Sequence, residues 1–181
     1  MTAMMNLLIV RTSSMGDLIH TWPAITELAK HYPNVSISWL AEENFAEIAG
    51  LHPAVVQVIP MALRKWRKTL FRQDTWREIK ALRQRLKATR WDLIIDSQGL
   101  LKSAVSARLA GGPLAGYSWQ CSRERLASFF YDKKVTVSWD YPAVQRNRLL
   151  FSQVLGYQAD GPAEFGITKG DKPAWTAEQS Y

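Results

Sequence analysis

One acidic residue, Asp17, stands at the end of a short polar turn near the start of the chain. The turn follows Leu7–Val10, a continuously apolar run that is typical of a buried parallel strand. Apolar residues then recur at helical spacing, so Asp17 is expected at the N-cap of a helix. A carboxylate there has two interpretations. It is either a cap that accepts a backbone N–H or a general base that takes a proton from a substrate hydroxyl.

A position at a helix N-terminus and a role as general base have opposite requirements for the pKa of Asp17. A helix N-terminus stabilises the carboxylate and lowers its pKa, which makes it a weaker base. Burial beside an anionic substrate acts in the opposite direction. His20 lies one helical turn further on and could hydrogen-bond Asp17, although a lone histidine on a helix is more often a plain surface or core residue.

The turn itself has small side chains at Ser13, Ser14 and Gly16. Backbone N–H groups could therefore approach a ligand oxyanion closely. The turn has one glycine where a dinucleotide fingerprint or a phosphate-binding P-loop needs two or three, so neither motif is present. In an open parallel sheet, ligands bind beyond the carboxyl ends of the strands, and this turn occupies such a place.

A second candidate site is a basic cluster with four positive charges in five residues. It follows a predicted strand at 54–59, so it is expected in a loop at the same edge of the sheet as Asp17. Such side chains bind phosphate and carboxylate oxygens, but they also occur in solvated loops and in nonspecific nucleic-acid patches. The position beside Asp17 favours a small phosphorylated substrate or a lipid surface. The cluster comprises Arg64, Lys65, Arg67 and Lys68.

The composition agrees with an anionic partner. The formal net charge is +7 and the isoelectric point is near 9.7, which suits nucleic acid, an acidic lipid surface or a phosphorylated substrate. The single Cys121 rules out an internal disulfide and suits a reducing cytoplasm. The apolar run 7–10 is too short for a signal peptide or a membrane span, so we expect a cytosolic protein that reaches a membrane from its surface.

The elements that must position these residues alternate between strand and helix, which predicts an α/β fold with a doubly wound, mostly parallel, Rossmann-like sheet. We expect one domain at 1–157 and a linker at 158–181, where Gly, Pro, Asp and Lys become frequent. Pro23 should kink the first helix or move its start. Predicted strands lie at 7–10, 35–40, 54–59, 92–96, 114–117 and 134–138. Predicted helices follow Asp17 and lie at 43–49, 75–90, 101–110, 123–131 and 142–155.

Several separated blocks of the chain, in this order, resemble glycosyltransferase family 9, the bacterial lipopolysaccharide heptosyltransferases. The first block and the basic cluster look more like the first heptosyltransferase of inner-core assembly than the second. The blocks are Leu8–Thr21, Arg64–Lys68, Asp96–Ser103, Trp119-Gln120, Arg123-Glu124 and Leu126–Tyr131.

The resemblance implies a GT-B architecture, in which two Rossmann-like domains face each other across a cleft. The chain would be the N-terminal, acceptor-binding half. The reaction would move L-glycero-D-manno-heptose from ADP-heptose to a Kdo sugar of Kdo2-lipid A with inversion and without a cofactor. No Asp-x-Asp motif stands in a suitable loop, which agrees with a metal-independent reaction. Family members exceed 300 residues, so we expect ADP-heptose to bind mainly to a C-terminal domain that this chain lacks, and the chain alone to be inactive.

The resemblance also assigns roles to residues. Asp17 corresponds to the family's catalytic base. The implied partners are Kdo2-lipid A and the anionic cytoplasmic face of the inner membrane, with no nucleic acid. Two alternatives stay open: another sugar transferase of this family, and a non-catalytic module that binds anionic lipid or another polyanion. The expected acceptor-binding residues are Arg64, Lys65, Arg67, Lys68 and Arg123. The expected cleft-loop residues are Ser13, Ser14, Gly16, Gln98 and Gly99.

Overall fold

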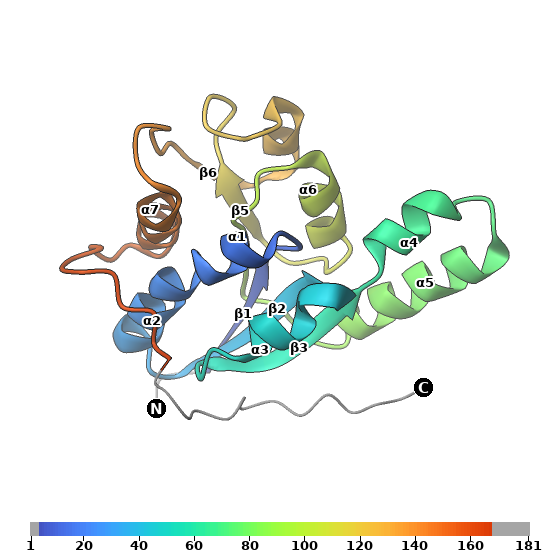
Figure 1. Ribbon diagram of the computed structural model, residues 1–181, viewed down its shortest axis with the longest axis horizontal. Coiled ribbons are helices and arrows are strands. Elements are labelled where there is room, and N and C mark those ends of the chain that lie inside the picture. Colours follow the sequence, from blue (N-terminus) through green and yellow to red (C-terminus); the bar gives the residue numbers. More distant parts are fainter. Residues whose placement is uncertain (1–3, 168–181) are drawn as a thin grey trace.

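A computed structural model describes residues 4–167 (Figure 1). Its centre is a six-stranded, entirely parallel sheet with the order β3-β2-β1-β4-β5-β6. The chain builds outward from β1 in one direction and then returns to add strands on its other side. The predicted doubly wound α/β fold is confirmed. The strands are β1 (Met5–Val10), β2 (Val35–Glu42), β3 (Val55–Met61), β4 (Leu93–Asp96), β5 (Leu114–Tyr117) and β6 (Lys133–Val135).

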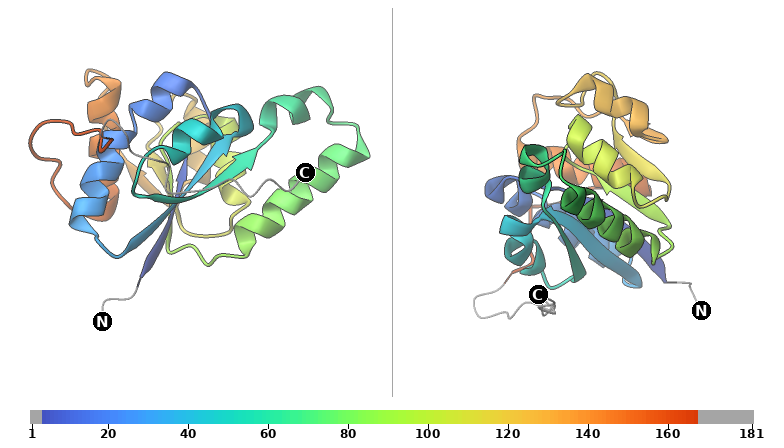
Figure 2. Two further views of the ribbon diagram at one scale, coloured as in Figure 1. Left: turned by 60° about the horizontal axis from the view of Figure 1, so that its bottom comes forward. Right: turned by 90° about the vertical axis from the view of Figure 1, so that its right-hand side faces the viewer.

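Helices cover both faces of the sheet, as the two views of Figure 2 show. The side chains of β1 alternate between two cores: Leu7 and Ile9 pack on one face, and Leu8 and Val10 on the other. This is why the first strand is apolar throughout. The helices are α1 (Met15–Ile19), α2 (Trp22–His31), α3 (Ala46–Gly50), α4 (Leu63–Lys68), α5 (Gln73–Lys87), α6 (Leu101–Arg108) and α7 (Ala143–Leu155). Two 3₁₀ helices are η1 (Glu43–Phe45) and η2 (Arg125–Phe130).

The first helical segment is divided in two near Pro23, as expected. α1 ends at Ile19, and Pro23 lies in the first turn of α2, where its missing N–H costs no helical hydrogen bond. The expectation that Asp17 is the N-cap is wrong. Ser14 is the N-cap, and Asp17 lies three residues into α1, where its Oδ2 accepts the Ser14 backbone N–H at 3.2 Å.

Two further expectations need correction. β3 continues through Pro60 instead of ending before it, which is possible because β3 is an edge strand and needs fewer donors. The basic cluster is a helix, α4, and not a loop. Leu63 and Trp66 are three residues apart, so both apolar side chains lie on the helix face that packs against the core.

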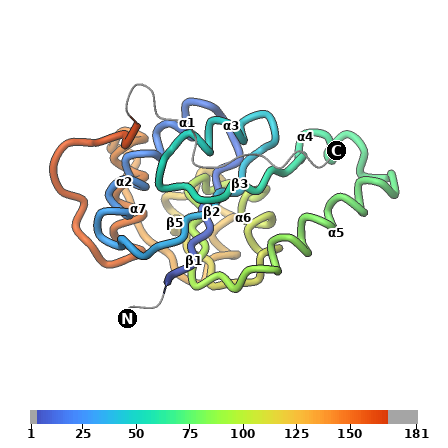
Figure 3. The backbone as a smooth tube through the Cα atoms, turned by 90° about the horizontal axis from the view of Figure 1, so that it is seen from below, coloured from blue at the N-terminus to red at the C-terminus, as the bar shows by residue number. Residues whose placement is uncertain are grey.

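The helices α4 and α5 form a hairpin that projects from the body of the molecule (Figures 1 and 3). At the other end, α7 stops at Leu155, and Gly156 follows with a φ of 83°. Residues 157–167 form neither helix nor strand, and the rest of the expected linker, 168–181, lies outside the described residues. Within residues 4–167, no helix has both the length and the apolar character needed to cross a bilayer.

Candidate active site at the switch point of the sheet

The chain reverses its direction of winding between β1 and β4, and ligands of doubly wound sheets bind at such a switch point. Asp17 lies there, just beyond β1. Its Oδ1 is 2.9 Å from Arg11 Nη2 and 3.6 Å from Arg123 Nη2. Its side chain retains 18% exposure, so the carboxylate is held by cations and still accessible. His20 is exposed and is not among the partners of Asp17, so the possible pairing of these two residues is not formed.

The environment of Asp17 keeps it ionised. Partial burial by itself would raise its pKa, but the Arg11 guanidinium, the Ser14 N–H and the Arg123 guanidinium outweigh burial. The pKa of Asp17 is therefore held below its ordinary value. At neutral pH the group is a carboxylate that can accept a proton.

Gln98 fixes the turn that leads to Asp17. This buried side chain accepts hydrogen bonds through Oε1 from the Thr12 backbone N–H at 3.0 Å and from the Thr12 hydroxyl at 2.8 Å. Its Nε2 donates to the Ser13 carbonyl at 3.3 Å. Gln98, the second residue after β4, thus holds the residues after β1, across the switch point.

Gln98 is in turn held by Asp96, the last residue of β4, which is fully buried. Its Oδ1 accepts the backbone N–H of Gln98 at 2.8 Å, and its Oδ2 accepts the hydroxyls of Ser103 at 2.7 Å and Tyr131 at 2.8 Å. Burial raises the pKa of Asp96 in spite of these donors. Because this carboxylate faces inward, it supports the site and does not reach a substrate.

Arg123 reaches Asp17 through a loop that is attached to Gly99. The Gly99 carbonyl accepts the backbone N–H of Glu124 at 2.9 Å. Gly99 has a φ of 67°, and a Cβ there would lie 3.2 Å from the Arg123 backbone nitrogen and 3.3 Å from the Tyr117 ring. A glycine is therefore required both for the backbone conformation and for the close approach of the Arg123 loop.

Beside Asp17 lies a water-sized cavity of about 20 Å³ whose lining includes three arginines, Arg11, Arg123 and Arg146. Arg146 is almost fully buried, with its guanidinium 3.5 Å from the centre of the Trp139 ring. In the described part of the chain, the buried Nε atoms of Arg11 and Arg146 have no hydrogen-bond partner. Three guanidinium groups around one small space suit an anionic oxygen.

Asn147 joins this cavity to the helix that carries Asp17. Its Nδ2 donates to the His20 carbonyl at 3.0 Å, and its Oδ1 lies 3.5 Å from the Tyr117 hydroxyl. Burial raises the pKa of Tyr117 to about 12, so this phenol is neutral at physiological pH. The wall of the cavity therefore combines cations with neutral hydrogen-bonding groups.

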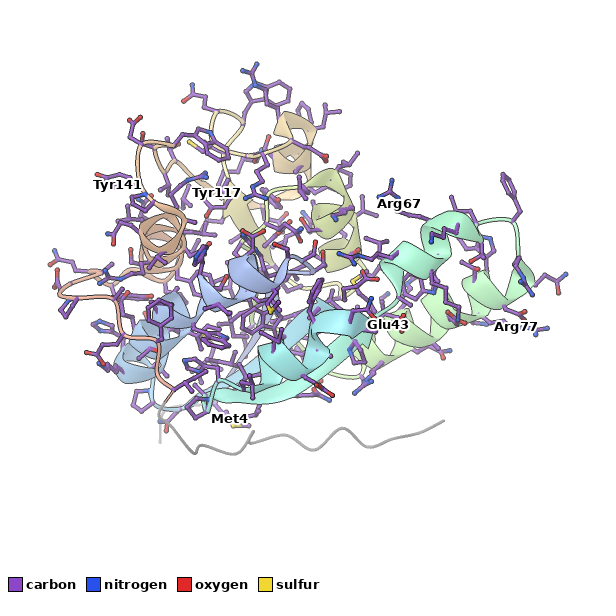
Figure 4. The ribbon with its side chains drawn as sticks, viewed as in Figure 1. Met4, Glu43, Arg67, Arg77, Tyr117 and Tyr141 are labelled. Carbon is purple, nitrogen blue, oxygen red and sulfur yellow. The ribbon has the colours of Figure 1, made fainter. Side chains whose placement is uncertain are left out.

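The basic helix α4 lies at the same edge of the sheet as Asp17 but does not line this cavity. β3 and β1 are separated by β2, so the starts of their loops are about 10 Å apart. Figure 4 shows Arg67 projecting upward from α4. Lys65 is engaged with Glu78 of α5 at 2.6 Å, and the Arg64 guanidinium lies 5.1 Å from the centre of the Phe45 ring. Within residues 4–167, Arg67 and Lys68 form no ion pair.

The structure thus brings together Asp17, Arg123 and the cleft loops, and holds the four basic residues of α4 nearby. The functional roles of all these residues stay predictions. Sequence reasoning missed Arg11 and Arg146 as site residues, although Arg11 stands directly after the first strand, at the edge of the sheet where ligands bind. Among residues 4–167, no group of three or more His, Cys, Asp or Glu residues could hold a metal ion.

Comparison with known proteins places this chain and its fold in a class of sugar transferases. The model of glycosyltransferase family 9 (heptosyltransferase) matches residues 79–180, more than half of the chain. The chain belongs to glycosyltransferase family 9.

The chain is similar to particular relatives over nearly its whole length. It is 50% identical to lipopolysaccharide heptosyltransferase 1 of Pseudomonas aeruginosa over 170 residues, which cover 91% of this chain and 47% of that protein. The structure of E. coli heptosyltransferase WaaC with ADP matches with a TM-score of 0.86 and 44% identity, over 90% of this chain and 51% of that one. The same enzyme with ADP-2-deoxy-2-fluoro heptose matches equally well, with a TM-score of 0.86 and 45% identity. The chain spans about half the length of these relatives.

Proposed function

We propose that this chain is the acceptor-binding half of an inverting heptosyltransferase. The complete enzyme transfers L-glycero-D-manno-heptose from ADP-heptose to a Kdo sugar of Kdo2-lipid A. The observation that carries the proposal is Asp17, an ionised and partly exposed carboxylate at the switch point, with arginines on one side of it. The similarity to lipopolysaccharide heptosyltransferase 1 supports the choice of donor and acceptor.

In the proposed reaction, Asp17 acts as the general base. The acceptor hydroxyl gives its proton to a carboxylate oxygen of Asp17, and the acceptor oxygen forms a bond to the anomeric carbon of the heptose. The bond from that carbon to the diphosphate breaks, and ADP leaves with the electron pair. Attack opposite the leaving group inverts the anomeric centre. No metal ion takes part in this proposal.

The low pKa of Asp17 in the unliganded site makes it a weak base, and the acceptor can change this. Arg123 is 44% exposed and lies 3.6 Å from Asp17, so its contact is looser than that of Arg11. An acceptor phosphate or carboxylate that binds Arg123 would draw its charge away from Asp17. Asp17 would then become a stronger base when the acceptor is in place.

The exposed cations of α4 extend this acceptor site. The distance of about 10 Å between the loops after β1 and β3 suits a substrate with several anionic groups, in which one group lies near Arg123 and others near Arg67 and Lys68. Arg64 and Lys65 complete the basic surface. An acceptor made of acidic sugars on a phosphorylated lipid has such a distribution of charge.

The donor and the location of the enzyme complete the proposal. ADP-heptose binds mainly to a second domain, which agrees with relatives about twice as long as this chain, so the chain alone transfers no heptose. A lipid-linked acceptor places the enzyme on the cytoplasmic face of the inner membrane. The proposed partners exclude nucleic acid.

Two experiments test this function. The first assays a complete enzyme that contains this half on Kdo2-lipid A and on a core that already carries heptose. Product from Kdo2-lipid A supports the proposal, and product only from the heptosylated core would identify a later transferase. The second measures binding of this chain to Kdo2-lipid A and to DNA at matched salt. A clear preference for the sugar lipid is expected, whereas equal, steeply salt-dependent binding would indicate a general polyanion-binding module.

A further inference from the structure

The tip of the α4–α5 hairpin exposes apolar side chains far from the sheet. Phe71, in the turn between the two helices, is 103% exposed, beside Leu70 at 47% and Trp76 at 59%. Exposing these three large side chains to water is unfavourable, and neighbouring exposed apolar groups often mark an interaction surface. The projection of the hairpin leaves this tip accessible (Figure 1).

The turn that presents Phe71 is held by defined hydrogen bonds. The Thr75 hydroxyl lies 2.7 Å from the Thr69 carbonyl and donates to it, and the Trp76 indole N–H donates to the Leu70 carbonyl at 2.9 Å. The Arg72 backbone N–H bonds the Thr69 carbonyl at 3.0 Å. The backbone of the tip is thus largely satisfied from within, and Phe71 points outward from a fixed turn.

Positive charge surrounds these apolar side chains. From residue 67 to residue 77 there are four basic residues and only one acid, Asp74. Arg77 and Arg72 lie 3.2 Å and 4.0 Å from Asp74, and both stay more than 70% exposed. An aromatic and aliphatic tip with a ring of Lys and Arg matches an anionic bilayer, where the rings enter the headgroup region and the cations meet lipid phosphates. The basic residues are Arg67, Lys68, Arg72 and Arg77.

We propose that the α4–α5 tip is a membrane-docking element that inserts Phe71 and Leu70 into the interface of an anionic phospholipid bilayer. Trp76 lies at the headgroup level, and the surrounding cations bind phosphates. The same hairpin carries α4, which begins at the carboxyl edge of the sheet, so docking brings the basic surface of the candidate site toward the lipid. The inference depends on the proposed function for its setting, because a lipid-linked acceptor requires access to a membrane.

The experiment measures binding of the 181-residue chain to vesicles without any sugar lipid, so its outcome does not depend on transferase activity. Vesicles of phosphatidylglycerol and phosphatidylethanolamine are compared with vesicles of phosphatidylcholine. We expect binding to the anionic vesicles to be at least about tenfold tighter and to weaken as salt rises. Phe71→Ser should lower the anionic partition coefficient about tenfold, which corresponds to about 1.4 kcal/mol. The variant should fold normally because Phe71 contacts only solvent.

Phe165→Ser is the matched control. Phe165 is 40% exposed and belongs to the segment after α7, at the opposite end of the molecule from the hairpin (Figure 1). Binding should be unchanged in this variant. An equal loss of binding in both variants, or no loss in Phe71→Ser, would overturn the assignment.

A probe of insertion depth gives a second, independent measurement. The only native thiol, Cys121, is buried, so Phe71→Cys offers one accessible site for a polarity-sensitive dye. The dye should shift to shorter emission wavelengths on anionic vesicles and be quenched by nitroxides near the headgroups. A dye that stays in water while the chain binds would show that another surface makes the contact.

Discussion

Arg11 and Asp17 form an ion pair of 2.9 Å in which the arginine side chain is 5% exposed and the aspartate side chain 18%. The cation is thus buried under the carboxylate, and the open side of the carboxylate is left for a ligand. The arrangement fixes Asp17 without enclosing it. This geometry agrees with the proposed role of Asp17 as a general base, because the open side of the carboxylate can accept a hydrogen bond.

The ion pairs of Asp17 predict a dependence of stability on pH. The pKa of Asp17 is lower in the folded chain than its ordinary value of 3.8, so the group stabilises the fold above about pH 4. This contribution is lost as the pH falls through the lower folded pKa. Urea unfolding at pH 7 should show Asp17→Asn less stable than the wild type, and the difference should shrink as the pH approaches 3. A difference that grows on acidification would show that these ion pairs do not stabilise the fold.

Gln98→Leu should loosen the turn before Asp17. The substitution leaves the buried Thr12 N–H without its acceptor, which typically costs about 1–3 kcal/mol of unfolding free energy. Turnover of the complete enzyme should fall as well, because Asp17 loses its fixed position. Gln57→Leu is a suitable control: Gln57 is exposed and makes one long hydrogen bond of 3.4 Å, so its loss should change the stability by less than about 0.5 kcal/mol.

Gly99→Ala should affect both stability and acceptor binding. A left-handed conformation costs a residue with a Cβ about 1–2 kcal/mol, and here the Cβ would also press on the Arg123 loop. Gly156 has a similar φ of 83° but open space around it. Gly156→Ala should therefore show the conformational cost alone. Calorimetric unfolding and titration with Kdo2-lipid A separate the two effects, and equal results for both variants would remove Gly99 from the site.

Tyr131→Phe should destabilise the support beneath the site. The buried hydroxyl donates to Asp96 at 2.8 Å, and an intramolecular hydrogen bond typically contributes about 0.5–1.5 kcal/mol. Tyr141 is 48% exposed and points away from the core (Figure 4), so Tyr141→Phe should be almost neutral. Denaturant midpoints compare the two variants directly, and similar midpoints would argue against a structural role for the Asp96 network.

Much of this fold follows from local sequence patterns. The apolar run 7–10 and the helical periodicity after Asp17 predicted β1 and the helices beyond it, because burial repeats along each element. The helix at α4 was missed because its packing depends on the core and on a hydrogen bond from Trp66 to Glu78, twelve residues away. Arg11 was missed as a site residue because its role depends on tertiary contacts. Its guanidinium donates to the Ser97 carbonyl and forms an ion pair with Asp17. Arg146 reaches Cys121 over 25 residues. Local patterns contain no signal for such contacts.

The role of Asp17 is tested most directly by Asp17→Asn in a complete enzyme, with turnover and affinity for Kdo2-lipid A measured on the same preparation. The amide keeps the shape of the side chain but cannot accept the proton, so kcat should fall by about 10²–10⁴-fold, with acceptor affinity changed no more than about threefold. Near wild-type turnover in Asp17→Asn would contradict the account. So would a loss of activity explained entirely by lost acceptor binding.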